Sequence, residues 1–334
     1  MSAQLPESSA GTRSRLSISS GSGEFARRNR AILVAYGIVV VLFTAGTIHS
    51  SGYASGTNIR SLLIYGSTIG IAAAGQSLCI LTGGIDLSIP LTMTGAAVLT
   101  GQLSQGESSR LPQVFLLIAV LAIAVGIVNG AGVAYGGVPP IIMTLGSNAA
   151  LQSLVLVYSN GGGSAPAPPA LERWVTTYVL GIPKQVLIWA AIAIVMSVVL
   201  TRGTLGRRLY AIGTNPTAAF LAGNNVRRAL IVPYVVSALC GALAGILLMA
   251  FTGGAYFTLG DPYLFATAAA VAVGGASILG GSGHYIGTVA GALVLTLMVS
   301  LLTLLNVGQA WLNIAYGMIL LGALLIAGSR STRR

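Results

Sequence analysis

The sequence predicts an all-α polytopic membrane protein with about ten transmembrane helices. Of its 334 residues, 54% are hydrophobic and only 7% are charged, and the mean hydropathy is +0.86. A soluble domain carries about 25% charged residues. The apolar runs are about 20 residues long, which suits spanning helices rather than the alternating segments of about ten residues that build a β-barrel. The 45 glycines, with pairs such as Gly126/Gly130 and Gly241/Gly245, predict close helix crossings.

Ten apolar segments follow one another along the chain. The third is short and begins at Pro90, so we expect it to be broken or to cross only part of the bilayer. The Ser/Gly/Arg-rich residues 1–30 predict a disordered basic tail, 31–328 the transmembrane domain, and 329–334 a second basic tail. The expected spans are 31–48, 61–82, 90–104, 112–134, 140–158, 185–201, 230–252, 262–280, 285–305 and 309–328.

The distribution of Arg and Lys predicts that both termini are cytoplasmic. With ten spans and an inside N-terminus, thirteen of the 17 basic residues fall on the cytoplasmic side, in 1–30, 202–228 and 329–334. Only four fall in the outer loops. This asymmetry is typical of orientation in the membrane, so the net charge of +11 is not interpreted as nucleic-acid binding.

The long inner connection contains a predicted short helix. Asn215 is a good N-cap and Pro216 suits the first helical position, while Gly223 is a natural stop. A helix of about two turns is marginal alone in water. We therefore expect the segment 216–222 either to dock on a cytoplasmic partner or to rest on the membrane surface.

The chain lacks the residues of an ATPase or a metal enzyme. It has no G-x-x-x-x-G-K-[ST] motif, and its only lysine is Lys184. Its two histidines, His49 and His284, are far apart in the sequence. We expect a non-catalytic subunit that holds no metal or cofactor of its own.

Uncharged polar side chains recur inside the apolar runs, where they must face protein or a cavity. For any single residue, hydrogen bonding between helices is the simpler interpretation. Together they suit a path for an uncharged polyol. The candidate path residues are Gln76, Thr92, Thr144, Asn148 and Gln152.

One carboxylate stands apart from the other five acidic residues, because Asp86 lies closest to the middle of a continuous apolar region. Its run, Thr82-Gly83-Gly84-Ile85-Asp86-Leu87-Ser88, resembles the signature of the ribose-type sugar permeases of bacterial ABC importers. These belong to the branched-chain-amino-acid/ribose permease superfamily. The resemblance covers roughly 60–328. Four further blocks agree in order: 139–146, 157–161, 210–219 and 273–283. The chain departs from the pattern at Pro90, where glycine is frequent, and at 264–267, which lacks acidic residues.

The resemblance implies an importer permease fold in the bacterial plasma (inner) membrane that translocates a pentose, a hexose or a related polyol into the cytoplasm. It also implies partners: cytoplasmic ATPase subunits that bind ATP and Mg²⁺, an extracytoplasmic sugar-binding protein, and a second permease copy or paralogue. The loop 203–228 would couple to the ATPase. The implied coupling residues are Arg207, Arg208, Gly213, Asn215, Pro216, Ala218, Ala219 and Gly223.

The orientation places the signature run at the cytoplasmic end of the second span. There we expect Gly83, Gly84, Asp86 and Ser88 to shape an inner gate. We expect the Asp86 carboxylate to fix a turn through hydrogen bonds to nearby backbone groups, rather than to hold substrate.

Two other functions fit parts of the pattern. A branched-chain amino acid ABC permease would share the architecture, but the signature run favours sugar. An ion-coupled secondary transporter would require coupling carboxylates within the spans, and only Asp86 qualifies.

Overall fold

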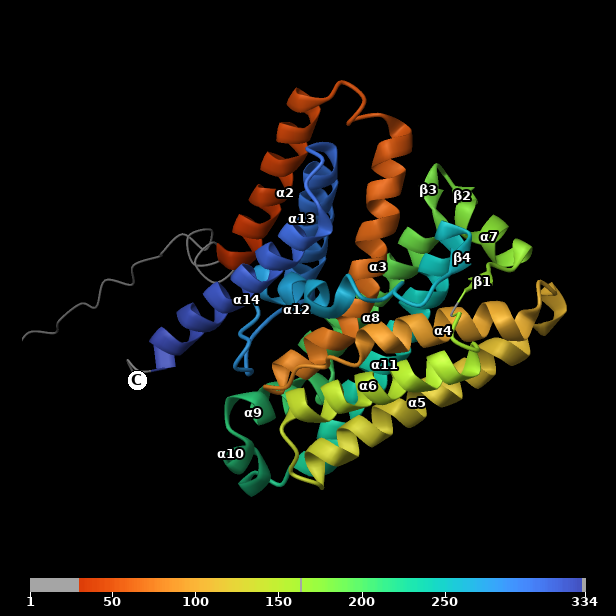
Figure 1. The fold of residues 1–334 in the computed structure, drawn as a ribbon. Helices are drawn as coiled ribbons and strands as arrows, with labels where there is room; N and C mark the ends of the chain where they lie inside the picture. The colour runs from red at the N-terminus through yellow and green to blue at the C-terminus, as the bar shows by residue number, and fades with distance from the viewer. Residues whose placement is uncertain (1–29, 163, 332–334) are drawn as a thin grey trace, which may run out of the picture.

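The computed structural model describes residues 30–162 and 164–331, and helices dominate it (Figure 1). Most of the two predicted basic tails, residues 1–29 and 332–334, lies outside the described residues. Residues 329–331 of the second tail continue the last helix. The elements are α2 (Arg30–His49), α3 (Gly56–Leu81), α4 (Ile89–Ser104), the 3₁₀ turn η1 (Ser108–Arg110), α5 (Leu111–Ala134), α6 (Pro140–Tyr158), β1 (Ala165–Pro166), α7 (Pro169–Thr176), β2 (Tyr178–Val179), β3 (Ile182–Pro183), α8 (Lys184–Arg202), α9 (Thr204–Thr214), α10 (Pro216–Leu221), α11 (Val226–Thr252), β4 (Gly254–Ala255), α12 (Tyr263–Val273), α13 (Tyr285–Leu304) and α14 (Gln309–Ser331).

Every predicted span contains a helix, and seven helices of the described chain are long and apolar enough to cross a membrane. They are α2, α3, α5, α6, α8, α11 and α13. The prediction for 262–280 is too long, because α12 ends at Val273. The expected break in the third span lies before the helix rather than within it. Pro90 occupies the first turn of α4, where its missing N–H costs no helical hydrogen bond.

The α3 helix forms the core of the molecule. Every residue from Gly66 to Leu81 is buried, and α11, α13, α12 and α8 pack around it. In contrast, α2 and α6 expose most of their apolar side chains, as expected for helices that face lipid or another subunit.

Glycines allow the main helices to cross at backbone contact, as the sequence predicts. A Cβ atom on Gly126 of α5 would lie 2.4 Å from Val235 Cα of α11. A Cβ on Gly245 of α11 would lie 2.1 Å from the Met93 carbonyl oxygen of α4. Such distances exclude any larger residue unless the helices separate.

The connector between α12 and α13 (residues 274–284) explains why α12 is short. Gly275 has a φ of +88°, which ends the right-handed helix and strongly favours glycine. The helix ends then pack closely, since a Cβ on Gly287 would lie 2.0 Å from the Gly274 carbonyl oxygen. The chain therefore reaches α13 as irregular backbone.

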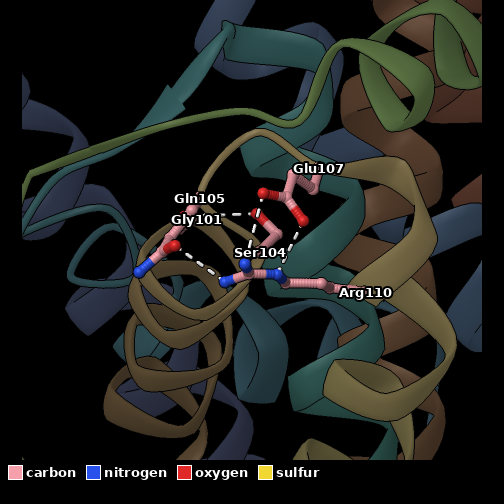
Figure 2. A network of polar contacts seen from close by, with 5 residues as sticks. All are labelled: Gly101, Ser104, Gln105, Glu107 and Arg110. Carbon is pink, nitrogen blue, oxygen red and sulfur yellow. Dashed lines mark hydrogen bonds and ion pairs between the residues drawn. The ribbon is translucent and has the colours of Figure 1, made fainter.

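Short strands and turns close the end of the molecule opposite α9 and α10 (Figure 1). Strand β1 pairs with β4, and β2 pairs with β3 in a hairpin. Figure 2 shows the turn between α4 and α5, where the Arg110 guanidinium forms an ion pair with Glu107 at 2.8 Å and donates to Gln105 Oε1 at 2.7 Å. The ion pair is exposed, so it contributes at most about 1 kcal/mol.

The α4–α11 crossing gives a test of the fold. We expect Gly245→Ala to lower the unfolding midpoint of the detergent-purified protein, because the added methyl group cannot fit beside Met93. The control is Gly37→Ala on α2, where no atom lies within 4 Å of the new Cβ and the helix gains propensity. Equal midpoints for the two variants would contradict this packing.

Candidate functional site

The signature turn (residues 82–88) joins α3 to α4, and Asp86 organises it. The α3 helix ends at Leu81 with Thr82 as its C-cap, and Gly83 follows with a φ of +81°. Asp86 is only 1% exposed. Its Oδ1 accepts a hydrogen bond from the Ser88 backbone N–H at 2.9 Å and another from the Ser88 hydroxyl at 2.6 Å. The carboxylate therefore holds the turn at the start of α4 through one backbone and one side-chain hydrogen bond.

Side chains from α3 itself and from α6 hold the same turn. The Asp86 backbone N–H donates to Gln76 Oε1 of α3 at 3.2 Å. The Leu87 N–H donates to the Thr144 hydroxyl of α6 at 3.0 Å, and that hydroxyl also lies 3.2 Å from the Ile85 carbonyl oxygen. The turn thus replaces helical hydrogen bonds with side-chain partners, as buried irregular backbone requires.

An amide on α5 and a hydroxyl on α6 fix Ser88. Asn129 Nδ2 of α5 donates to the Ser88 hydroxyl at 2.9 Å, and the Ser147 hydroxyl of α6 donates to Asn129 Oδ1. The turn therefore connects α3, α4, α5 and α6. Sequence reasoning did not select Asn129 or Ser147 for this network, although both are polar residues in apolar runs, which is the signal that could have found them.

The far side of the Asp86 carboxylate faces the Ser237 hydroxyl, which interacts with it without forming a hydrogen bond of regular geometry. Asp86 Oδ2, Gln76 Nε2 and Ser237 Oγ are buried without a hydrogen-bond partner within the described chain. None of the basic side chains described in the structure forms an ion pair with Asp86. The described residues also contain no group of three or more His, Cys, Asp or Glu side chains placed to hold a metal ion.

The predicted path residues occupy three environments. Gln76 and Thr144 are completely buried against the signature turn. Thr92 lines a cavity of about 480 Å³ between α4, α5 and α6, whose other walls are almost all apolar. On α6, Asn148 is half-buried and Gln152 is exposed. Gln76, Thr144 and Thr92 do not share one open polar surface, so their place in a translocation path stays a prediction.

The coupling segment (residues 203–228) forms two helices at one end of the molecule (Figure 1). Asn215 caps α10 by accepting a hydrogen bond from the Ala218 N–H at 3.0 Å, and Pro216 opens that helix, as predicted. Gly223 ends the turn with a φ of +83°. The preceding helix, α9, was not predicted. Its signal is the spacing of Leu205, Leu209 and Ile212, which marks one apolar helix face.

The predicted coupling residues divide into exposed and buried groups. Arg207, Arg208, Asn215, Pro216, Ala218 and Gly223 are exposed, and Gly213 is half-buried. Ala219 is buried at 4% exposure, so it supports α10 from beneath. Phe220 and Leu221, which lie on the predicted docking helix, are apolar side chains that are 66% and 80% exposed. Two large apolar groups on a charged loop are a signal for a protein contact.

Three of the motif blocks meet where α9 contacts the end of α3. A Cβ on Gly213 would lie only 1.9 Å from the Leu81 carbonyl oxygen and 2.5 Å from the Gly281 nitrogen. That nitrogen donates to the Leu81 carbonyl at 3.0 Å. The Tyr210 phenol donates to the Gly283 carbonyl at 2.5 Å, and partial burial raises the pKa of Tyr210, so it remains a proton donor at neutral pH.

The connector also touches the signature turn itself. A Cβ on Gly280 would lie 2.8 Å from the Gly83 nitrogen and 3.1 Å from the Gly213 carbonyl oxygen. The coupling segment, the connector and the signature turn therefore form one backbone junction. We call this the α3 junction.

Comparison with known proteins identifies the family. The profile of the family described as "Branched-chain amino acid transport system / permease component" matches residues 58–328. The chain belongs to this family. It is 33% identical to the ribose import permease protein RbsC of Escherichia coli (strain K12) over 302 residues, which cover 89% of this chain and 91% of that protein.

Other relatives agree over similar lengths. The ribose import permease protein RbsC of Haemophilus influenzae is 31% identical over 303 residues, 89% of this chain and 93% of that protein. The D-allose transport system permease protein AlsC of Escherichia coli is 28% identical over 290 residues, 87% of each chain. No solved structure matches the chain. The chain is thus an ABC importer permease and a multi-pass inner-membrane protein.

The hydrogen bonds of Asp86 predict a ranked effect on stability. Asp86→Ala removes the acceptor for both Ser88 donors and should cost on the order of 1–3 kcal/mol for a buried donor left unsatisfied. Asp86→Asn keeps a carbonyl acceptor and should cost less. Thermal unfolding of the permease in detergent measures both, with exposed Glu107→Ala as the control. If all three variants unfold with the wild-type midpoint, the carboxylate does not hold the turn.

Proposed function

We propose that this chain is the non-catalytic transmembrane subunit of an ABC importer that carries a monosaccharide or a related polyol into the cytoplasm. The observation that supports this most is the alignment with permeases named for ribose and D-allose over about nine-tenths of each chain. The described spans offer uncharged hydroxyl and amide groups, which suit a neutral polyol.

The family description mentions branched-chain amino acids, but the charges argue against such a substrate. An amino acid carries a carboxylate and an ammonium group, and both need charged or strongly polar partners. The basic side chains described in the structure lie at or near helix ends or in connections, as Arg60, Arg202 and Arg227 do. Asp86 is enclosed by the signature turn, so it is not placed to bind an ammonium group or to couple an ion gradient.

The coupling segment is the proposed contact for the ATPase subunits, which bind ATP and Mg²⁺. The exposed side chains of Phe220 and Leu221 would enter a pocket on the ATPase, and Arg207 and Arg208 would lie at its edge. Because Gly213 already touches the Leu81 carbonyl, a shift of α9 would push the α3 junction and the signature turn with it. In this mechanism the turn acts as an inner gate biased by ATP-driven closure.

The remaining parts follow from this orientation. Both termini and α9–α10 would face the cytoplasm, and the strands β1–β4 would face the sugar-binding protein outside. The exposed and mostly apolar face of α6 is the proposed contact with a second permease copy or paralogue. Residues 31–328 would make up the permease domain.

The function is tested by reconstitution. Liposomes containing the permease with the ATPase and binding protein of its own importer should take up radiolabelled D-ribose or D-allose only with ATP inside and binding protein outside. Leucine uptake under the same conditions is the comparison. Uptake of leucine without either sugar would show that the amino acid alternative is correct.

The ATPase contact gives a separate prediction. Phe220→Asp should abolish co-purification of the ATPase, because a charge would enter an apolar contact, while membrane abundance stays at the wild-type level. The matched control is Leu180→Asp, an exposed leucine in the hairpin at the opposite end. Retention of the ATPase by the Phe220→Asp variant would show that α10 is not the docking helix.

A further inference from the structure

A small apolar groove opens between α2, α8 and α13, where α8 leads into α9. Its volume is about 260 Å³. Among its lining residues, Leu200 and Tyr285 are buried, whereas Leu33 and Ile286 are 50% and 52% exposed. All three helices are long and apolar enough to cross a membrane. The groove is therefore open on a surface whose natural surroundings are lipid chains.

Close packing and hydrogen bonds hold the walls of this groove in place. The Tyr36 phenol of α2 donates to the Ile286 carbonyl of α13 at 3.3 Å. The Tyr285 phenol donates to the Gly70 carbonyl of α3 at 2.8 Å. At the start of α2, the Ala31 side chain would lie only 2.6 Å from a Cβ on Gly275 of the connector. The groove is thus already formed before anything binds, which lowers the entropic cost of binding.

Basic side chains surround the end of the groove. Arg30 is the first residue of α2, two positions before the lining residue Ile32, and Arg202 is the last residue of α8, directly after the lining residue Thr201. Both arginines are exposed. Arg207 of α9 donates from Nη1 to the Arg202 carbonyl at 3.1 Å, which brings a third guanidinium to the end of α8.

No acidic side chain neutralises these arginines from the elements around them. The sequences of α2, α8, α9, α10, α13 and the connector contain no Asp or Glu. Across 30–162 and 164–331, the ion pair that forms joins Glu107 to Arg110 in the turn between α4 and α5. Orientation in the membrane explains positive charge on this side, but it does not require an apolar groove that ends between two of the arginines.

The start of α13 adds a further anion-binding feature to the groove. Its N-cap residue, His284, lines the groove and makes no side-chain capping hydrogen bond. The His284 imidazole also has no hydrogen-bond partner or ion pair within the described chain. A helix N-terminus carries partial positive charge, which favours a phosphate group.

These features match the two parts of one kind of molecule. An anionic phospholipid carries a phosphate at the level of the membrane surface and apolar chains directly beneath it. Basic pockets between spanning helices on the cytoplasmic side are suited to such headgroups. A soluble anion would use the arginines but leave the apolar walls unused.

We propose that this groove binds an anionic phospholipid of the cytoplasmic leaflet. Its phosphate lies between Arg30 and Arg202, beside His284, and an acyl chain follows Leu33, Leu200 and Ile286. The site rests on the membrane orientation of the chain and not on the identity of the substrate. Because Arg207 contacts Arg202 and His284 ends the connector, the lipid contacts both segments that lead to the α3 junction.

Native mass spectrometry of the purified permease tests the headgroup contacts. In detergent with added lipid, the wild type should retain phosphatidylglycerol in preference to phosphatidylcholine. Arg30→Gln/Arg202→Gln should weaken phosphatidylglycerol binding about 25-fold, because each juxtamembrane arginine contributes about fivefold. The matched control is Arg60→Gln/Arg173→Gln, which removes the same net charge from the start of α3 and from α7 and should bind as the wild type does.

Filling the groove tests the acyl-chain contact without changing any charge. Ser197 lines the groove, and its hydroxyl bonds only to the Ala193 carbonyl of its own helix. Ser197→Phe should therefore lower phosphatidylglycerol occupancy at least about fivefold. Val195→Phe is the control, since Val195 lies on the same helix, is 59% exposed and does not line the groove. Where Ser197→Phe does not fold, the arginine pair still gives the answer.

The outcomes separate a lipid site from its alternatives. Equal binding of phosphatidylglycerol and phosphatidylcholine by the wild type would overturn the proposal, whether residues 1–29 or nothing fills the groove. Equal weakening by both arginine pairs would reduce it to general charge attraction. If sn-glycerol 3-phosphate binds as tightly as phosphatidylglycerol, the site takes a soluble anion and the lipid assignment is wrong. Failure of sugar uptake would overturn the proposed function and leave this site unaffected.

Discussion

The rest of the structure depends on how the chain satisfies its backbone polar groups where α3 ends inside the protein. Within a membrane, no water is available to bind an unpaired N–H or C=O group, and each unsatisfied group is costly. The Leu81 carbonyl therefore accepts from the Gly281 N–H, and the signature turn receives side-chain partners from Gln76, Thr144 and Asp86. These requirements explain why segments far apart in the sequence meet at one point.

Because of this constraint, α3 contacts several distant parts of the protein along its length. Its first half lines a cavity of about 740 Å³, its second half is wholly buried, and its end contacts both the coupling segment and the connector. A displacement at α9 cannot be absorbed at Gly213, because backbone already touches backbone there. Interfaces packed this closely shift between discrete arrangements rather than deform gradually. Under the proposed function, the helix would link the ATPase contact to the substrate side.

The sequence predicts the framework well because its signals are local. Apolar length places a helix in each of the ten predicted segments, and Asn215 with Pro216 gives the start of α10. Predictions fail where a distant contact decides the outcome. The α12 helix is shorter than its apolar run because Gly275 turns the chain and the α13 backbone lies against Gly274. Gln76 and Thr144 are polar residues in spans, but hydrogen bonds to the turn occupy them.

The sequence alone determined the membrane class, the helix order and the five motif blocks, since hydropathy and short-range patterns depend on neighbouring residues. Only the tertiary structure shows which of those blocks contact one another. Gly213, Leu81 and Gly280 have no local signal of their proximity, and only the close approach of three backbones creates the α3 junction. The cavity beside residues 256–266 likewise draws its walls from five helices and a loop. Such a surface exists only when packing brings distant segments together.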